Sequence, residues 1–259
     1  MADAPLEGVG VLVTRPEEQA GDLVDAIEAA GGRAIVFPVI EIAPRSPLEI
    51  EADFAGQADP DIVIFVSRNA VEHGIAWAGD GAVAAVGPAT AAAIEAAARV
   101  VDIRPASGFD SESLLGEPAL KDVRGKTIRI IRGNGGRELL ATTLRERGAK
   151  VDYLEVYARR LPDHSESDIE AVTAKLASGD IAAVVVMSVE SLRNLLALLP
   201  ESSHGAFAES RLVTPAARVI KEIRDRLPGC PATLADGPGA EEIVRAIAAL
   251  ARHRSGKHS

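Results

Sequence analysis

The chain has 259 residues, of which 47% are hydrophobic and 25% are charged, a balance typical of a globular protein with an apolar core. Its net charge of −10 argues against nucleic acid as a partner, and its single cysteine, Cys230, excludes an intrachain disulfide and a cysteine-based metal cluster. The five histidines lack paired metal-ligand spacing, and because neither a signal peptide nor a membrane-length apolar stretch is found, we expect a cytoplasmic protein with no membrane partner.

The first forty residues have the pattern of a strand–helix–strand unit. Residues 9–13 are an apolar run that ends at the turn Thr14-Arg15-Pro16, and apolar residues then recur at helical spacing up to a glycine pair at 31–32. Proline and the glutamates after it suit the first turn of a helix, and glycine suits its end. A second apolar run follows at residues 34–37. Units of this kind build parallel sheets.

The same plan returns five more times along the chain. The apolar runs and the turns that follow them are 62–66 with Ser67-Arg68-Asn69, 82–86 with Gly87-Pro88, 127–131 with Arg132-Gly133-Asn134-Gly135-Gly136, 182–187 with Ser188-Val189-Glu190, and 211–213 with Thr214-Pro215. Arg15 aligns with Arg132, and the run before Ser67 aligns with the run before Ser188. The sequence therefore predicts two similar halves.

Two segments bounded by proline, 38–44 and 154–160, alternate between apolar and other residues and read as extended connectors. Because the chain then crosses twice between domains, we expect one discontinuous α/β domain and one inserted α/β domain. The predicted fold class is α/β, with two parallel-sheet, flavodoxin-like domains joined by a two-stranded β linker. The expected boundaries are 1–37 plus 163–251 for the discontinuous domain, 44–154 for the inserted domain, 38–43 and 155–162 for the linker strands, and 252–259 for a basic, disordered tail.

The chemistry is expected at the carboxyl ends of the predicted strands. In parallel sheets ligands bind there, because helix N-termini direct free N–H groups and a positive dipole outward. The turns carry arginines and hydroxyls along one edge of each domain, and with the connectors as a hinge we expect the two edges to face each other across a cleft. That arrangement suits a small ligand with several carboxylates. The predicted binding residues are Thr14, Arg15, Ser67, Arg68, Asn69, Gly87, Arg132, Gly133, Ser188 and Thr214.

Each of these residues also has a purely structural explanation. Serine, threonine, asparagine and glycine are ordinary helix caps, and an arginine at a turn is commonly a solvated charge. The case for binding rests on the position of all these residues at the carboxyl edge of the predicted sheets. Other motifs are missing: the glycines at 133–136 do not have the G-x-G-x-x-G spacing, and neither a Walker sequence nor a G-x-S-x-G elbow occurs.

Tyr157 lies in the second predicted connector. A phenol ordinarily stays protonated at neutral pH, so it can donate a hydrogen bond or a proton. Packing between connector and domain is the alternative role, and the residues alone favour it.

Several motifs together resemble the uroporphyrinogen-III synthase family. They are V-L-V-T-R-P-E-E-Q-A, F-P-V-I-E-I-A-P, I-V-I-F-V-S-R-N-A-V, A-V-G-P-A-T-A, I-R-G-N-G-G-R-E-L-L and L-E-V-Y-A-R, in that order over residues of about 9 to 200. The segment 213–217 departs from the family's glycine-containing turn, which puts the contacts of Thr214 in doubt.

The resemblance implies two α/β domains joined by a two-stranded linker, and an enzyme that needs no cofactor. The implied reaction converts hydroxymethylbilane to uroporphyrinogen III. Its terminal hydroxyl leaves as water, and ring D is inverted through a spiro intermediate. The resemblance makes Tyr157 the best candidate for the proton donor. It supports carboxylate binding by Thr14, Arg15, Ser67, Asn69, Arg132 and Ser188, and we expect a monomer.

Two other functions remain open from the sequence. A non-enzymatic two-domain protein that binds a small anion would need a docking surface or an effector segment, neither of which is visible. A nucleotide-dependent transferase would need a phosphate-binding loop, which is missing.

Overall fold

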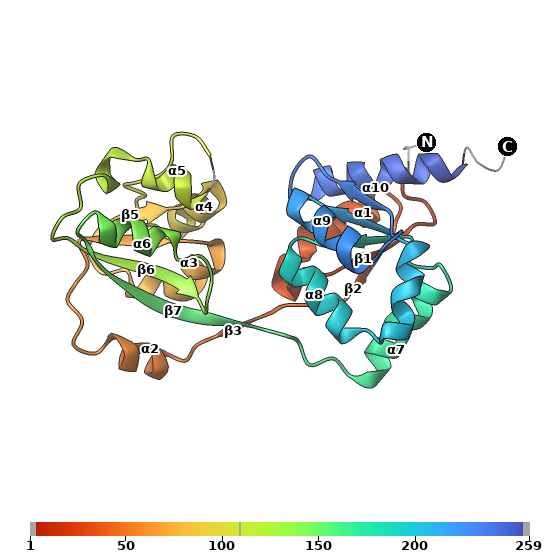
Figure 1. The fold of residues 1–259 in the computed structure, drawn as a ribbon, viewed down its shortest axis with the longest axis horizontal. Helices are drawn as coiled ribbons and strands as arrows, with labels where there is room; N and C mark the ends of the chain where they lie inside the picture. Colours follow the sequence, from red (N-terminus) through yellow and green to blue (C-terminus); the bar gives the residue numbers. More distant parts are fainter. Residues whose placement is uncertain (1–3, 109, 256–259) are drawn as a thin grey trace. The chain divides into compact units, whose positions relative to one another are not determined.

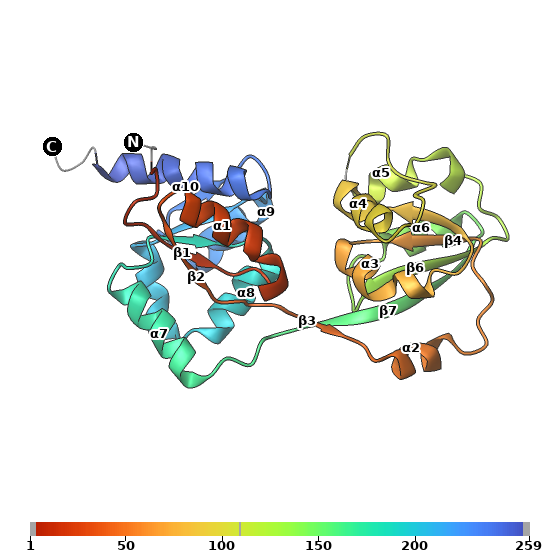
Figure 2. The ribbon, with the colours of Figure 1, turned by 180° about the vertical axis from the view of Figure 1, so that it is seen from behind.

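The computed structural model describes residues 4–108 and 110–255, with the side chains of residues 54 and 250–255 excepted. The chain forms two compact units: the first contains the residues up to Glu41 and those from Arg160 onward, and the second is Ile42–Arg159. Each unit holds a five-stranded, parallel-dominated sheet with helices on both faces (Figures 1 and 2). The α/β class predicted from the sequence is thereby confirmed.

The first unit has the strand order β10-β9-β8-β1-β2, and every neighbouring pair in it is parallel. Its strands are β1 (Gly10–Val13), β2 (Arg33–Val36), β8 (Ala183–Val185), β9 (Arg211–Thr214) and β10 (Ala232–Leu234). Its helices are η1 (Glu17–Gln19), α1 (Gly21–Ala29), α7 (Glu166–Ala177), α8 (Val189–Leu198), η4 (Glu201–Ala208), α9 (Ala217–Arg226) and α10 (Ala240–Ser255).

The sheet of the first unit is covered on both faces, which explains why its strands are almost wholly apolar. Leu23 of α1 and Ile243 of α10 pack with Val11 of β1 in one buried cluster. Figure 1 shows α8 and α9 in front of this sheet, and Figure 2 shows α1 in front of it.

The second unit has the strand order β3-β7-β6-β4-β5. The pairs β4–β5, β4–β6 and β6–β7 are parallel, and β3 adjoins β7 at the edge. Its strands are β3 (Glu41–Pro44), β4 (Ile62–Phe65), β5 (Ala82–Ala85), β6 (Thr127–Gly133) and β7 (Lys150–Arg160). Its helices are α2 (Pro47–Phe54), α3 (Arg68–Gly74), η2 (Ile75–Trp77), α4 (Pro88–Ala96), α5 (Ser111–Leu115), η3 (Pro118–Leu120) and α6 (Leu139–Glu146).

Two separate clusters fill the two faces of the second sheet. On one face, Leu114 of α5 and Leu144 of α6 pack with Ile130 of β6. On the other face, helices α3 and α4 pack with Ile131 of β6 and Tyr157 of β7. Because successive side chains of a strand point to opposite faces, the residues of β6 alternate between these clusters. This alternation decides where the candidate site residues lie.

The two units share one spatial plan. The neighbours β2-β1-β8-β9 of the first unit correspond to β7-β6-β4-β5 of the second. This order agrees with the alignment of Arg15 with Arg132 and of Ser67 with Ser188 in the sequence. In both sheets the strand order reverses at the central pair, β1–β8 or β6–β4, and such a switch point is where open α/β sheets bind ligands.

The structure differs from the sequence expectations at several segment ends. Strand β6 continues through Arg132 and Gly133, which we expected in the turn, and its pairing with β7 shifts register between these two residues. Strand β10 and helices α2 and α5 were not predicted. Helix α10 runs to Ser255 and includes the first residues of the segment 252–259 predicted as disordered, while residues 256–259 lie outside the described residues.

Candidate functional site

In the second unit, Ser67 and Tyr157 lie together near the carboxyl ends of β4 and β7, the two strands that flank β6. Ser67 follows β4 as the N-cap of α3, and its hydroxyl accepts a hydrogen bond of 3.1 Å from the N–H of Ala70. The Ser67 hydroxyl is also 3.2 Å from the Tyr157 hydroxyl. Tyr157 is only 1% exposed, whereas Ser67 is half-buried, so of the two hydroxyl-bearing residues Ser67 is the more accessible.

Gly133 makes room for the ring of Tyr157. A Cβ atom at position 133 would lie 2.4 Å from Cε2 and 2.6 Å from Cζ of Tyr157, closer than any carbon pair tolerates. The ring of His73, from the last turn of α3, lies 5.9 Å from the Tyr157 ring in a tilted arrangement. Glycine at the end of β6 is therefore required by the packing of the phenol above it.

Arg132 lies on the other face of the sheet, away from Tyr157. Its side chain is only 6% exposed and pairs with Glu138 at 3.1 Å, with its guanidinium 4.5 Å from the centre of the Tyr153 ring. Tyr153 donates a hydrogen bond of 2.5 Å to Glu138, and this bond, followed by the one from Arg132, lowers the pKa of the Glu138 carboxyl. Burial, followed by the bond to Glu138, raises the pKa of Tyr153.

The consequence is that the guanidinium of Arg132 already has a carboxylate partner and an aromatic platform. Its Nε also donates to the carbonyl of Gly133 at 3.2 Å. Arg132 therefore holds the turn between β6 and α6 in place. No sequence pattern signalled this cluster, because Tyr153 and Glu138 are separated by fifteen positions and belong to different elements.

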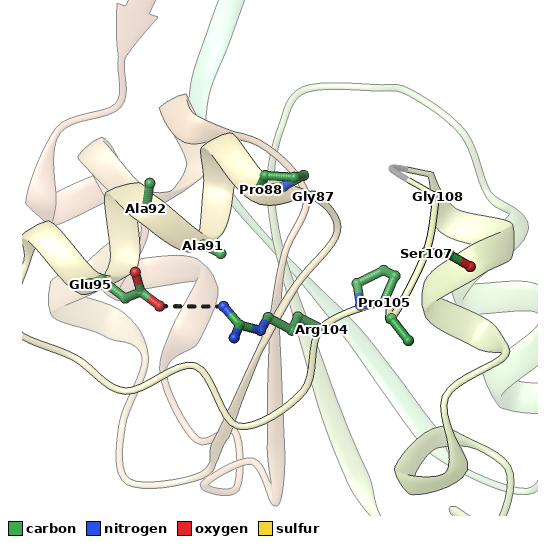
Figure 3. A pocket seen from close by; sticks show the side chains of 10 residues that line it. Gly87, Pro88, Ala91, Ala92, Glu95, Arg104, Pro105, Ser107 and Gly108 are labelled. Atoms are coloured by element: carbon green, nitrogen blue, oxygen red, sulfur yellow. Dashed lines mark ion pairs between the residues drawn. The ribbon is translucent and has the colours of Figure 1, made fainter.

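The other predicted residues of the second unit lie at the first turns of α3 and α4. Arg68 is exposed and Asn69 is half-buried. Gly87 is the N-cap of α4 and lines a pocket of about 320 Å³ (Figure 3). Arg104 and Ser107 reach this pocket from the following loop, and Arg104 pairs with Glu95 at 3.7 Å. The sequence prediction missed these two side chains, because they lie outside the turns that directly follow strands.

In the first unit, Thr14 and Ser188 follow the strands β1 and β8, as predicted, whereas Thr214, expected in the turn, is the last residue of β9; the hydroxyls of all three have internal partners. Thr14 donates 2.6 Å to the carbonyl of Val185, across the switch point. Ser188 caps α8 by accepting 3.0 Å from the N–H of Ser191. Thr214 is fully buried and accepts 3.2 Å from the N–H of Ala216. These hydroxyls therefore hold the turns in place.

Arg15 is half-buried beside the same edge of the first unit. It donates 2.6 Å to the carbonyl of Pro238. Its Nε is buried and has no hydrogen-bond partner among the described residues. Burial lowers the pKa of the Arg15 guanidinium, and the nearby carboxylate of Asp22 acts in the opposite direction. A half-buried cation with an unused donor is suited to receiving an anion.

Residues 4–108 and 110–255 contain neither a cluster of metal-ligating side chains nor a membrane-spanning helix. Three or more histidine, cysteine, aspartate or glutamate side chains nowhere gather there as metal ligands would. The helices of this part of the chain are all too short or too polar to cross a membrane.

The two sheets, each with a reversal of strand order at its central pair and polar turns at its carboxyl edge, define a two-unit, flavodoxin-like α/β protein. A family model described as uroporphyrinogen-III synthase HemD matches residues 21–226. The chain belongs to the uroporphyrinogen-III synthase family.

Individual relatives agree with this assignment. The uroporphyrinogen-III synthase of Escherichia coli K12 is 31% identical over 92% of this chain and 100% of its own length. The enzyme of that name from Salmonella typhimurium is 35% identical over 74% of this chain and 81% of its own length.

A solved structure shares the fold. It is a mutant uroporphyrinogen III synthase from the extremely thermophilic bacterium Thermus thermophilus, with a TM-score of 0.61 at 20% identity, covering 94% of this chain and 99% of that one. The family resemblance and the prediction of an enzyme are thus confirmed, and the non-enzymatic anion-binding alternative is set aside.

Proposed function

We propose that this chain converts hydroxymethylbilane to uroporphyrinogen III, closing the macrocycle with inversion of ring D and release of water. The family assignment carries the proposal, because the match to the Escherichia coli relative extends over the whole of that protein. We further propose that the chain works as a cytoplasmic monomer without a cofactor.

The substrate carries eight carboxylates, and the edges of the two sheets suit such a ligand. We assign its carboxylates to the turns that follow the parallel strands, where free N–H groups and helix dipoles favour negative charge. In the second unit the exposed guanidinium of Arg68 adds a positive charge, and in the first unit the unused Nε of Arg15 does the same. The other residues assigned to the binding turns are Thr14, Ser67, Asn69, Gly87, Gly133, Ser188 and Thr214.

Arg132 takes a different role in this proposal from the one expected of a turn arginine. Since Glu138 neutralises it and Tyr153 covers it, Arg132 fixes the turn whose backbone meets the substrate. Direct binding of a substrate carboxylate by Arg132 would require Glu138 to move away.

The enzyme's chemical task is mainly one of orientation. The free bilane closes without inversion, so the enzyme must hold the chain in a conformation that directs attack to the substituted carbon of ring D. Departure of the terminal hydroxyl requires a proton, and the phenol of Tyr157 in β7 is the group that we assign as its source.

The direct test is to supply hydroxymethylbilane to the purified chain and to separate the uroporphyrinogen isomers. We expect type III product in excess, at a rate proportional to the protein concentration. If saturating protein gives only the type I isomer that forms spontaneously, the proposal is wrong.

A further inference from the structure

The hydrogen bonds around Ser67 indicate which hydroxyl is the donor in the bond between Ser67 and Tyr157. A serine hydroxyl has one proton and two lone pairs. One lone pair of Ser67 Oγ accepts the N–H of Ala70 at 3.1 Å, and Tyr157 lies 3.2 Å away. The remaining question is which of the two hydroxyls donates to the other.

Burial answers that question. If Ser67 donated to Tyr157, the phenolic proton would need another acceptor, and within residues 4–108 and 110–255 the Tyr157 hydroxyl has Ser67 as its only hydrogen-bond partner. A phenol that is 1% exposed cannot turn to solvent instead. Buried donors are almost always satisfied, so Tyr157 donates to Ser67. Both lone pairs of Ser67 are then occupied, and its own proton points away from both neighbours.

From this arrangement we propose that Ser67 is the catalytic residue that meets the substrate, and that Tyr157 acts through it as a positioning residue and proton reserve. The inference rests on the proposed function. Ser67 is half-buried and Tyr157 is enclosed behind it by Gly133 and the α3 side of the sheet. The hydroxyl available at the switch point between β4 and β6 is that of Ser67.

The proton transfer balances without a further reagent. The bond between the terminal carbon and its hydroxyl oxygen breaks, and its electron pair goes to the oxygen. This oxygen takes the proton of Ser67 and leaves as water, while Ser67 takes the phenolic proton of Tyr157. The adjacent pyrrole nitrogen supplies the electrons of the azafulvenium ion. When the ring closes, the unsubstituted carbon of ring D loses its proton, which returns through Ser67 to the Tyr157 phenolate.

Ser67 also caps α3, so its removal affects folding as well as chemistry. Loss of a serine cap to alanine costs about 0.5–2 kcal/mol, whereas glycine costs only a few tenths. Ser67→Gly therefore removes the hydroxyl and leaves the cap nearly intact. A matched control is Ser46→Ala, because Ser46 caps α2 in the same unit through the N–H of Glu49, at an exposed site outside the binding turns.

The test compares kcat, measured as type III product, for the wild type, Ser67→Gly, Ser67→Thr, Tyr157→Phe and the double variant Ser67→Gly/Tyr157→Phe. We expect at least a tenfold loss of kcat in Ser67→Gly and in Tyr157→Phe. The double variant should lose no more than a further twofold, because both changes interrupt the same relay, the proton transfer from Tyr157 through Ser67. Ser67→Thr should retain most of the rate, and Ser46→Ala should keep it.

Deuterated water supplies a readout that a purely structural role would not change. The wild type should show a solvent isotope effect on kcat whose dependence on the deuterium fraction is curved, because two protons move together, and Tyr157→Phe should lose that curvature. Wild-type kcat in Ser67→Gly, or losses that multiply to about a hundredfold in the double variant, would overturn the relay. A wild type that forms only type I product would overturn the proposed function itself.

Discussion

Gly133→Ala is the smallest change that should disturb the site. The added Cβ would stand 2.4 Å from Cε2 and 2.6 Å from Cζ of Tyr157, whereas carbon atoms pack at about 3.5–4.0 Å. The ring must therefore retreat by roughly 1 Å, and overpacking of this kind costs about 1–3 kcal/mol. The same movement stretches the 3.2 Å bond to Ser67 beyond hydrogen-bonding range, so kcat should fall at least tenfold.

Urea unfolding followed by intrinsic fluorescence measures the stability loss directly. Trp77 and both tyrosines lie in the second unit, so the signal follows the unfolding of the unit that contains Gly133. Gly21→Ala is the control, because a Cβ at Gly21 meets no atom within 4 Å, and it should leave this transition and the rate unchanged. If Gly133→Ala kept wild-type stability and rate, the packing of Tyr157 against Gly133 would be refuted.

Three further predictions concern stability and reactivity. Asp152→Ala removes the 2.9 Å partner of Arg129, a side chain with 0% exposure, and should destabilise the second unit by about 3 kcal/mol in the same urea assay. The hydrogen bond from Arg193, joined by that from Arg226, lowers the pKa of Glu222 to about 2. The stabilisation that the ionised Glu222 carboxylate gives the folded state is thus complete above the unfolded pKa of about 4.3 and is lost as pH falls toward 2. In Glu222→Gln the free energy of unfolding should therefore depend less on pH in that window. Burial raises the pKa of Cys230 to about 11, so iodoacetamide at pH 8 should alkylate the folded chain at least tenfold more slowly than the chain in urea.

The strand–helix units were predictable because their signals are local. The apolar runs before Thr14, Ser67 and Ser188 are buried strands, and the turns that follow them do lie at the carboxyl ends of those strands. Proline and glycine mark these turns in the sequence, and buried parallel strands are apolar throughout, so composition alone locates them. Strand β10 escaped prediction because its three residues are not part of a longer apolar run, as those of β8 are, but stand between Pro231 and a turn rich in glycine.

The contacts within the site were less predictable because they depend on pairing between strands. The alternation of side chains along β6 places Arg132 on the α6 side, and the register shift at the end of β6 sets Gly133 opposite Tyr157. A sequence that reads Arg-Gly-Asn-Gly-Gly indicates a turn, and nothing in it shows which face of a sheet each residue will occupy. The expectation that Arg132 lies in the turn was therefore wrong, while the significance of Tyr157 came from the family resemblance.

The most direct test of the account is the isomer ratio measured as the protein concentration is raised at a fixed amount of hydroxymethylbilane. Spontaneous closure and the enzyme compete for the same substrate, so the type III fraction reports their relative rates. We predict that this fraction rises from none without protein to nearly all of the product at saturating wild-type chain. A fraction that stays at the spontaneous level at every concentration would contradict the central claim.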